Sequence, residues 1–304
     1  YSTIFMKVII TGSTGFVGTN LVKHIQENNL GEISLLSFRQ ALPQSLEGDV
    51  LIHLAGKAHD LKNTSNSQEY FEVNYEKTRD LFDLFLSSGS KDFIYFSSVK
   101  AVADTVNGVL VEDVIADPQT PYGKSKLQAE RYLLSKDLPE GKRLFVLRPC
   151  MIHGPGNKGN LNLLYKVVKK GIPYPLAGFE NQRSFLSIQN LNYIVEKIIS
   201  DRNIAGDIYN VADDESLSTN SVIKIIGEAD GREARLWRIN SGIIKTIAAI
   251  GDRLHLPLNS ERLKKLTESY VVSNNKIKHA LKIDKLPISS KEGLLTTIKS
   301  FRSS

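Results

Sequence analysis

The sequence predicts an α/β fold, a doubly wound parallel sheet with a smaller, mainly helical C-terminal substrate lobe. Short apolar runs alternate with segments of helical periodicity over the first half of the chain, as in repeated strand–helix–strand units. The run DVLIHLAG (49–56) is almost continuously apolar, as expected of a strand buried on both faces. After Pro149 the pattern loosens, and from about residue 213 it is mostly helical.

The elements follow one another in a regular order. Apolar runs predict strands at 7–12, 32–38, 49–56, 92–99 and 143–149. Apolar residues at helical spacing predict helices at 19–29, 74–89, 121–135 and 161–171. A strand–helix–strand return to the sheet is expected over 183–199 and 206–212. The predicted division is therefore discontinuous: a dinucleotide-binding domain over 6–153 and about 184–212, and a lobe over about 154–183 and 213–304.

Composition narrows the class of protein. At 41% hydrophobic and 24% charged residues the chain resembles an ordinary globular protein. No apolar run approaches the ~18–20 residues of a membrane span, and no signal-peptide pattern precedes the first strand, so we expect a cytoplasmic protein with no membrane insertion. Residues 1–5, before Met6, are expected to be an expression remnant. The single cysteine, Cys150, is expected to be a packed core thiol.

The net charge of +6 is modest for 304 residues. It indicates either a solvated basic surface or attraction to a phosphorylated small molecule. No Lys/Arg block stands out, so nucleic acid is not expected as a partner. His53, His59 and His153 show no metal-ligand spacing, and no metal is expected.

The first strand runs into a glycine-rich loop, TGSTGFVG at 11–18. Gly12 permits a tight turn, Gly15 lets a pyrophosphate approach the backbone, and Gly18 lets the next helix pack close to the sheet. The N-terminus of that helix offers N–H groups and a positive dipole end to phosphates. A loop of this kind between a strand and a helix predicts a Rossmann-type dinucleotide site.

The end of the second strand bears on the choice of cofactor. An acidic residue there would hold the adenosine ribose of NAD, but this chain reads Ser37-Phe38-Arg39. Arg39 would instead meet the 2′-phosphate of NADP, or it is an ordinary surface arginine. Only about a dozen residues precede the next strand, too few for a full helix and strand, so the adenine side should be abbreviated. NAD and NADP both stay open.

The segment YGKSK places Tyr122 and Lys126 four residues apart, on one face of a predicted helix. A free phenol, with a pKa of about 10, is a poor base near neutral pH. An ammonium group one helical turn away favours the phenolate and should lower that pKa. The pair therefore predicts proton transfer at a substrate hydroxyl, and Lys126 can also hold the nicotinamide ribose.

Together these motifs resemble the extended short-chain dehydrogenase/reductases, and among them the NAD(P)-dependent nucleotide-sugar epimerase/dehydratase family. The resemblance runs from Met6 to the last helix through TGSTGFVG, HLAG, FSSV, YGKSK, LRPCMIHGPG, RSFLSI and YNVADD. It implies an enzyme that uses NAD or NADP on a nucleoside-diphosphate sugar, a UDP-hexose or a 4-keto-6-deoxy derivative. Many relatives dimerise, so a homodimer is an expectation carried over from the family.

The resemblance assigns the cofactor to the glycine loop and neighbouring strand ends. Asn74 matches an asparagine that ties strand to helix near the cofactor, although it also suits a helix cap. The predicted cofactor-binding residues are Gly12, Ser13, Thr14, Gly15, Phe16, Val17, Gly18, Arg39, Leu54, Ala55, Asn74 and Lys126.

By the same resemblance Tyr122 and Lys126 match the catalytic pair, but the third member departs from the pattern. The family's Ser or Thr would fall at Val99. Ser98 is one residue short, and a shift of one residue along a strand turns the side chain to the other face. We expect Ser98 to serve if the strand end bends, with Ser97 as the alternative.

Lys100 follows, where 4,6-dehydratases of the family carry an acidic pair. Dehydration needs a carboxylic acid and a carboxylate, and the segment VKAV supplies neither. A similar segment occurs in 4-epimerases and 4-ketoreductases that serve surface polysaccharide synthesis. Lys100 would then contact the substrate or assist protonation at C4, unless it is a solvated loop lysine.

The substrate diphosphate is expected at cationic and amide groups in the second half of the chain. Arg183, opening RSFLSI, matches an arginine that binds the diphosphate in the family, where a guanidinium forms charge-assisted forks with phosphate oxygens. Asn157 and Lys158 lie in a loop that closes on the nucleotide sugar in relatives, and Arg262 is a second candidate. The expected activity is redox chemistry at C4, as a 4-epimerase or a 4-ketoreductase. The alternatives are a non-catalytic dinucleotide-sensing regulator and a reductase of non-nucleotide carbonyls.

Overall fold

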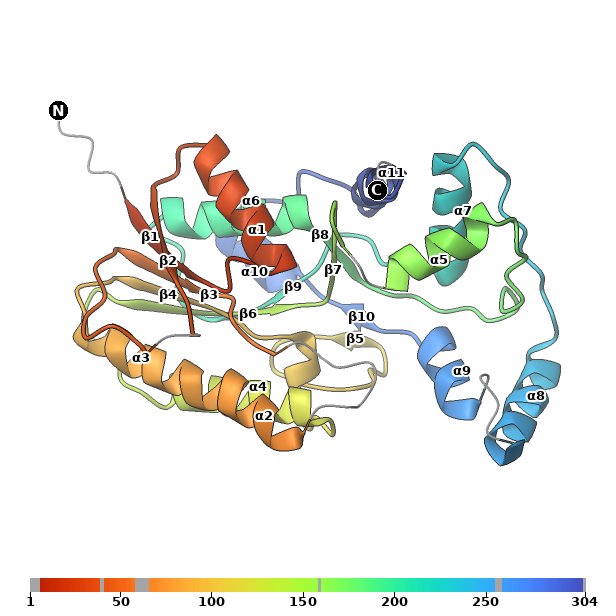
Figure 1. Cartoon of the computed structure of the whole chain (residues 1–304), viewed down its shortest axis with the longest axis horizontal. Coiled ribbons are helices and arrows are strands. Elements are labelled where there is room, and N and C mark those ends of the chain that lie inside the picture. The colour runs from red at the N-terminus through yellow and green to blue at the C-terminus, as the bar shows by residue number, and fades with distance from the viewer. Residues whose placement is uncertain (1–5, 39–40, 58–65, 158–159, 255–258, 303–304) are drawn as a thin grey trace.

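The main body is a six-stranded, fully parallel sheet with the strand order β2-β1-β3-β4-β6-β9 (Figure 1). The computed structural model describes residues 6–38, 41–57, 66–157, 160–254 and 259–302. The strands are β1 (Lys7–Thr11), β2 (Glu32–Leu36), β3 (Val50–His53), β4 (Asp92–Phe96), β6 (Arg143–Pro149) and β9 (Ile208–Val211). The chain reverses its direction of winding between β1 and β3, where open α/β sheets bind ligands. The predicted doubly wound α/β fold is confirmed.

Helices cover both faces of this sheet (Figure 1). One face carries α1 (Phe16–Glu27), α6 (Ile188–Ser200) and α10 (Asn275–Leu281). The other carries α2 (Ser67–Phe71), the π-helical turn η1 (Glu72–Glu76), α3 (Lys77–Ser87) and α4 (Pro121–Leu134). Alternate strand residues therefore enter different cores, and all four residues of β3 are buried, as predicted for a strand covered on both sides.

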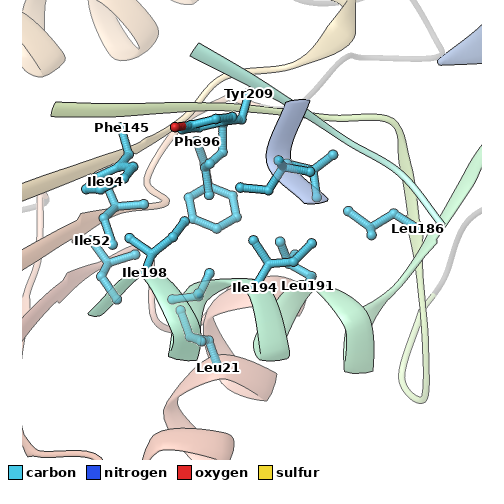
Figure 2. Packing of buried hydrophobic residues seen from close by; sticks show 14 of the residues in the cluster. Leu21, Ile52, Ile94, Phe96, Phe145, Leu186, Leu191, Ile194, Ile198 and Tyr209 are labelled. Atoms are coloured by element: carbon cyan, nitrogen blue, oxygen red, sulfur yellow. The ribbon is translucent and has the colours of Figure 1, made fainter. Parts of the chain in front are cut away.

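The larger core lies beneath α1 and α6. Figure 2 shows Leu21 of α1 and Leu191, Ile194 and Ile198 of α6 pointing at apolar side chains of the strands. The labelled residues of the six-stranded sheet are Ile52, Ile94, Phe96, Phe145 and Tyr209. On the opposite face Phe82 and Phe85 of α3 pack on Phe93, with ring centroids 4.9 and 5.2 Å from it. These two cores fix the carboxyl ends of the strands, from which the site is built.

The adenine side of the sheet is short, as the spacing predicted. Residues 37–49 connect β2 to β3, and their described part contains no helix or strand. Consequently β2 is the edge of the sheet beside β1.

The second half of the chain builds a lobe with its own core. Here α5 (Asn160–Lys169), α7 (Thr219–Ala229) and α11 (Ser290–Ser300) pack together, and α8 (Ser241–Leu254) and α9 (Ser260–Thr267) lie farther out (Figure 1). Two small parallel pairs connect lobe and sheet: β7 (Met151–His153) with β8 (Phe185–Ser187), and β5 (Val109–Leu110) with β10 (Val271–Val272). Of the strand–helix–strand return expected at 183–212, only β9 joins the main sheet, because β8 pairs with β7 instead. The exact domain division stays a prediction.

None of the helices in the described part of the chain is both long and apolar enough to span a membrane.

Candidate active site

The glycine loop joins β1 to α1, and two of its glycines are required by close packing. Gly12 has a φ of +71°, and a Cβ there would lie 2.6 Å from the backbone nitrogen of Ala55. A Cβ on Gly18 would lie 2.2 Å from the carbonyl oxygen of Gly12. By contrast, a Cβ on Gly15 would make only an ordinary 3.4 Å contact with that oxygen.

Gly15 is also the N-cap of α1, and it provides no side chain to cap the first helical turn. The N–H groups of that turn are therefore suited to an anion, and the helix dipole favours one there. Because no protein contact demands glycine at position 15, its lack of a side chain fits the close approach of a bound diphosphate. The loop thus fits the dinucleotide that the sequence predicted.

A chain of buried hydrogen bonds ties this loop to the end of β3. Thr11 Oγ1 accepts from the backbone N–H of Ala55 at 3.1 Å and lies 2.7 Å from Nδ1 of His53. Nε2 of His53 lies 2.8 Å from Oγ1 of Thr78, whose hydroxyl donates to the carbonyl of Asn74. Since the Thr78 proton is already used, His53 donates from Nε2; with Nδ1 accepting from the Thr11 hydroxyl, the ring is neutral.

Burial, and then the charge of Lys126, lower the pKa of His53 from 6.5 to about 3, in agreement with this neutral form. Sequence reasoning considered His53 only as a metal ligand. The sequence did offer a clue to this structural role of His53. The residue lies in a strand predicted to be buried on both faces, where each ring nitrogen needs a hydrogen-bond partner.

Asn74 ties the end of β3 to α4. Its Oδ1 accepts from the backbone N–H of Lys57 at 2.7 Å, and its Nδ2 donates to the Lys57 carbonyl and to Oγ of Ser125 at 3.2 and 3.1 Å. The residue lies inside the π-helical turn η1, so the helix-cap interpretation is wrong; Asn66 caps α2 instead. A Cβ on Gly56 would lie 2.9 Å from Asn74 Oδ1 and 3.2 Å from Lys126 Nζ, so this glycine allows the three groups to meet.

Tyr122 enters the site from the first turn of α4, where Thr120 caps the helix by accepting from Gly123 N–H. The Tyr122 ring meets Tyr70 edge-on, with centroids 6.2 Å apart. Tyr70 was missed at the sequence level, because it lies on a separate short helix with no motif of its own. Burial raises the pKa of Tyr122, and a side-chain hydrogen bond with Ser98 partly opposes that rise.

Tyr122 therefore does not have the lowered pKa that its spacing from Lys126 predicted, because burial has the larger effect. Lys126 Nζ donates to the Phe96 carbonyl at 2.9 Å and lies 4.9 Å from the ring centroid of Tyr95. Burial lowers the pKa of Lys126 to about 8, against the opposing charge of Glu130. The lysine is thus held between the end of β4 and Gly56.

The two serines after β4 point to different places. Ser97 donates to the carboxylate of Glu130, which is buried and paired with Arg148 at 2.6 Å. Ser98 instead hydrogen-bonds Tyr122 and caps the short 3₁₀ turn η2 (Val99–Ala101) by accepting from Lys100 N–H. The chain bends at this point, as the use of Ser98 required, and Val99 is buried in the core.

Lys100 follows in η2 and is held by the protein. Its Nζ donates to the Asp104 carbonyl at 2.8 Å and lies 4.1 Å from the ring centroid of Tyr270. The Tyr270 hydroxyl donates to the carbonyl of Ala103 at 2.7 Å, which fixes the ring under the ammonium. Lys100 is half-buried, so it is not a fully solvated loop lysine, and its contact with substrate stays a prediction.

Arg183 lies in the lobe beside a largely apolar cavity of about 350 Å³, here called the Arg183 cavity. Its Nε donates to the Glu268 carbonyl at 3.1 Å, and its guanidinium is 4.0 Å from the Glu268 carboxylate. Burial lowers the pKa of Arg183, which Glu268 and Tyr174 partly offset. The cavity is lined by Met151, Leu161, Leu164, Val167, Tyr174, Arg183, Phe185, Thr219, Val222 and Leu266.

The remaining predicted substrate residues are less informative. Asn157 uses Nδ2 to donate to the Ile152 carbonyl at 3.1 Å, so it fastens its own loop. Arg262 is exposed in the first turn of α9. Arg39 and Lys158 lie outside the described residues. Cys150 is buried in the larger core, as predicted. Within the described ranges, no group of three or more His, Cys, Asp or Glu side chains could hold a metal ion.

Comparison with known proteins assigns the chain to a family. Residues 8–212 match the model of the NAD dependent epimerase/dehydratase family. The chain belongs to this family. A UDP-glucose 4-epimerase from Vibrio cholerae is 32% identical over 245 residues, which are 71% of this chain and 74% of that protein. A GDP-6-deoxy-D-mannose reductase from Pseudomonas aeruginosa is 26% identical over 242 residues, 73% of this chain and 79% of that protein.

The solved structure of MoeE5 in complex with UDP-glucose and NAD has the same fold, with a TM-score of 0.72, 20% identity and coverage of 98% of this chain and 99% of that chain. The family and the fit of the glycine loop agree that this is an enzyme whose cofactor is NAD or NADP.

Proposed function

We propose that the protein carries out NAD(P)-dependent redox chemistry at C4 of a nucleoside-diphosphate sugar, as a 4-epimerase or a 4-ketoreductase, in the synthesis of surface polysaccharide precursors. The observation that carries this proposal is the hydrogen-bonded pair of Tyr122 and Ser98 near Lys126, at the same edge of the sheet as the glycine loop. The named activities of the Vibrio and Pseudomonas relatives support it.

In this proposal each side chain has a separate role. The glycine loop holds the diphosphate of the cofactor, and Lys126 holds its nicotinamide ribose. When bound, the nicotinamide accepts a hydride from C4 of the sugar or delivers one to it. Tyr122 takes the proton of the C4 hydroxyl during oxidation and returns a proton to that oxygen during reduction, while Ser98 hydrogen-bonds Tyr122 and the reacting oxygen.

The substrate is oriented from the lobe. Arg183 pairs with its diphosphate, and the apolar wall of the Arg183 cavity receives the uncharged part of the nucleotide. Lys100, held over Tyr270, contacts the sugar near C4.

Tyr122→Phe tests the catalytic role. The variant keeps the ring but removes the proton-transfer group, so kcat should fall by roughly 10²–10⁴-fold with cofactor affinity unchanged. Tyr132→Phe is a matched control on the same helix, because its hydroxyl contacts Asp83 at an exposed position. Full activity in Tyr122→Phe would contradict the catalytic role of this residue, whereas a wild type without turnover that still binds the dinucleotide would favour a dinucleotide-sensing regulator.

Arg183→Ala separates a nucleotide sugar from a carbonyl substrate without a nucleotide. If the Arg183 guanidinium binds the substrate diphosphate, its loss should raise KM for UDP-hexoses roughly 10–100-fold. The KM of a small carbonyl substrate without a diphosphate should not change. Thermal unfolding is measured in parallel, because Arg183 also contacts Glu268.

The nucleotide released from the denatured protein separates the two reactions. Stoichiometric NAD(H) retained through purification indicates a recycled cofactor and a 4-epimerase, to be assayed with UDP-hexoses. A protein that purifies without nucleotide and takes up NADPH indicates a consumed cofactor and a 4-ketoreductase, to be assayed with a 4-keto-6-deoxy nucleotide sugar.

A further inference from the structure

One face of α8 is both apolar and exposed. Ile243, Ile247, Ile250 and Leu254 are 56%, 44%, 49% and 63% exposed, and together they are called the α8 stripe. At about 100° per residue these positions fall within an arc of roughly 60° on one side of the helix. The neighbouring face of the same helix carries Ile244 and Ala248, which are 4% and 0% exposed. The α8 stripe is therefore a second apolar face beside the one that packs on the lobe.

The buried face of α8 is enough to anchor the helix to the lobe, so the α8 stripe is not needed for packing. Ile244 and Ala248 form a small cluster with Leu176 and with Leu263 of α9. Figure 1 shows α8 and α9 at the end of the lobe that lies away from the main sheet. Four large aliphatic side chains exposed side by side on one helix face are unusual for the surface of a monomeric protein and indicate a site of interaction.

The stretch of sequence that contains this helix carries most of the net positive charge of the chain. Residues 232–265 contain eight Lys and Arg against three Asp and Glu, a net charge of +5 out of +6 for the whole protein. The exposed cations in the described part of this segment are Arg232, Arg235, Arg238, Lys245, Arg253, Arg262 and Lys264. The remaining 270 residues are thus close to neutral. An amphipathic helix with exposed aliphatic residues and nearby cations has the composition of a helix that lies in a membrane interface.

We propose that the α8 stripe docks on the surface of an anionic lipid bilayer. The helix would lie in the plane of the interface, with the stripe between the headgroups and with Arg253, about 90° around the helix from the centre of the stripe, beside the lipid phosphates. Lys245, on the side of the helix away from the stripe, would add only longer-range attraction. This is peripheral binding and needs no spanning helix. Since α8 belongs to the lobe, docking would hold the lobe, rather than the main sheet, against the bilayer.

Charge favours a bilayer over a second copy of the chain as the occupant. A symmetric dimer through the α8 stripe would bring together two copies of the segment 232–265, each with a net charge of +5, and the like charges would repel. An anionic surface attracts that charge and accepts the apolar side chains at the same time.

Vesicle flotation tests this proposal on the full-length protein. Wild-type protein should float with vesicles of phosphatidylglycerol and phosphatidylcholine, float at least ~10-fold less with phosphatidylcholine alone, and be released by high salt. Ile247→Asp/Ile250→Asp should reduce binding at least ~10-fold, because charged groups replace apolar ones at the interface. Lys245→Glu/Arg253→Glu should reduce binding to the anionic vesicles only.

Ile115→Asp is the matched control, because Ile115 is 92% exposed and lies outside the lobe, between β5 and α4. It should float like the wild type. All variants should keep the wild-type thermal unfolding and turnover of a soluble nucleotide sugar, so loss of flotation is separable from loss of function.

Two results would overturn the proposal. One is equal flotation of wild type and Ile247→Asp/Ile250→Asp. The other is a wild type that does not float but runs as a dimer by light scattering, with the double aspartate variant running as a monomer; the occupant would then be a second copy.

Discussion

At the residue scale, Ser97 and Ser98 are neighbours with separate tasks. Ser98 hydrogen-bonds Tyr122, whereas Ser97 donates to the buried pair of Glu130 and Arg148. Ser98→Ala should lower kcat roughly 10–100-fold, and loss of the cap on η2 should cost about 0.5–2 kcal/mol of stability. Ser97→Ala should keep kcat but lower the free energy of unfolding by about 1–3 kcal/mol, because a buried carboxylate loses a donor.

Steady-state kinetics and denaturant unfolding of the two variants measure the two effects separately. The reverse outcome, with activity lost in Ser97→Ala and kept in Ser98→Ala, would contradict the proposed role of Ser98.

His53 makes the stability of the fold sensitive to acid. Its pKa falls from 6.5 to about 3 on folding, so its contribution to stability is fully present above pH 6.5 and is lost as pH falls toward 3. At two pH units below the unfolded value the loss is about 3 kcal/mol. His53→Gln keeps a donor and an acceptor for Thr11 and Thr78, so it should cost some stability at neutral pH but flatten the acid slope.

Urea unfolding at several pH values measures that slope, with His279→Gln at an exposed position as the control. An unchanged slope in His53→Gln would show that other groups cause the acid sensitivity.

How far the site could be predicted also differs from residue to residue. Tyr122 and Lys126 could be found because their spacing on a helix is a local property. The use of Ser98 depends on a bend after β4, and the pKa of Tyr122 depends on burial by distant segments such as the one that carries Tyr70. Neither is visible in local sequence, because both come from tertiary contacts.

At the scale of elements, the glycine loop separates a packing role from a binding role. Gly18→Ala should destabilise the fold, since its Cβ would meet backbone atoms of Gly12 at 2.2 Å. Gly15→Ala makes only a 3.4 Å contact and should unfold like the wild type. The same variant should lose at least ~10-fold in affinity for NAD(H) or NADP(H), because its methyl group would occupy the approach of the diphosphate.

Thermal unfolding without nucleotide and a fluorescence titration with NADH and NADPH make this comparison. Wild-type affinity in Gly15→Ala would place the diphosphate elsewhere.

The segment from Asn66 to Ser87 contains a helical irregularity that the sequence pattern did not predict. Helical spacing predicted a helix over 74–89, and α3 fills most of it. Asn74 itself lies in the π-helical turn η1, which joins α2 to α3. Such turns arise where local hydrogen bonding yields to tertiary contacts, here those of Asn74 with Lys57 and Ser125, so apolar periodicity does not reveal them.

At the scale of the whole molecule, the sheet and the end of the chain depend on one another. The larger core contains Tyr270, Val272, Ile277 and Leu286, although the match to the family model ends at residue 212. The same late segment supplies β10, the partner of β5, and Asn274 donates to the Ala212 carbonyl at 2.9 Å. Alternating strands and helices could predict the sheet, but they could not predict which distant residues cover it.

A chain that ends at residue 212 should therefore not fold by itself. Removing those four buried side chains forfeits roughly 6–12 kcal/mol of apolar burial, as much as the ~5–15 kcal/mol that stabilises a typical domain. The truncated chain should show no cooperative thermal transition and no binding of NADH or NADPH, whereas the full-length chain should show both. Cooperative unfolding of the truncated chain with intact nucleotide binding would mean that residues 6–212 form an independent domain and that the C-terminal segment serves only the lobe.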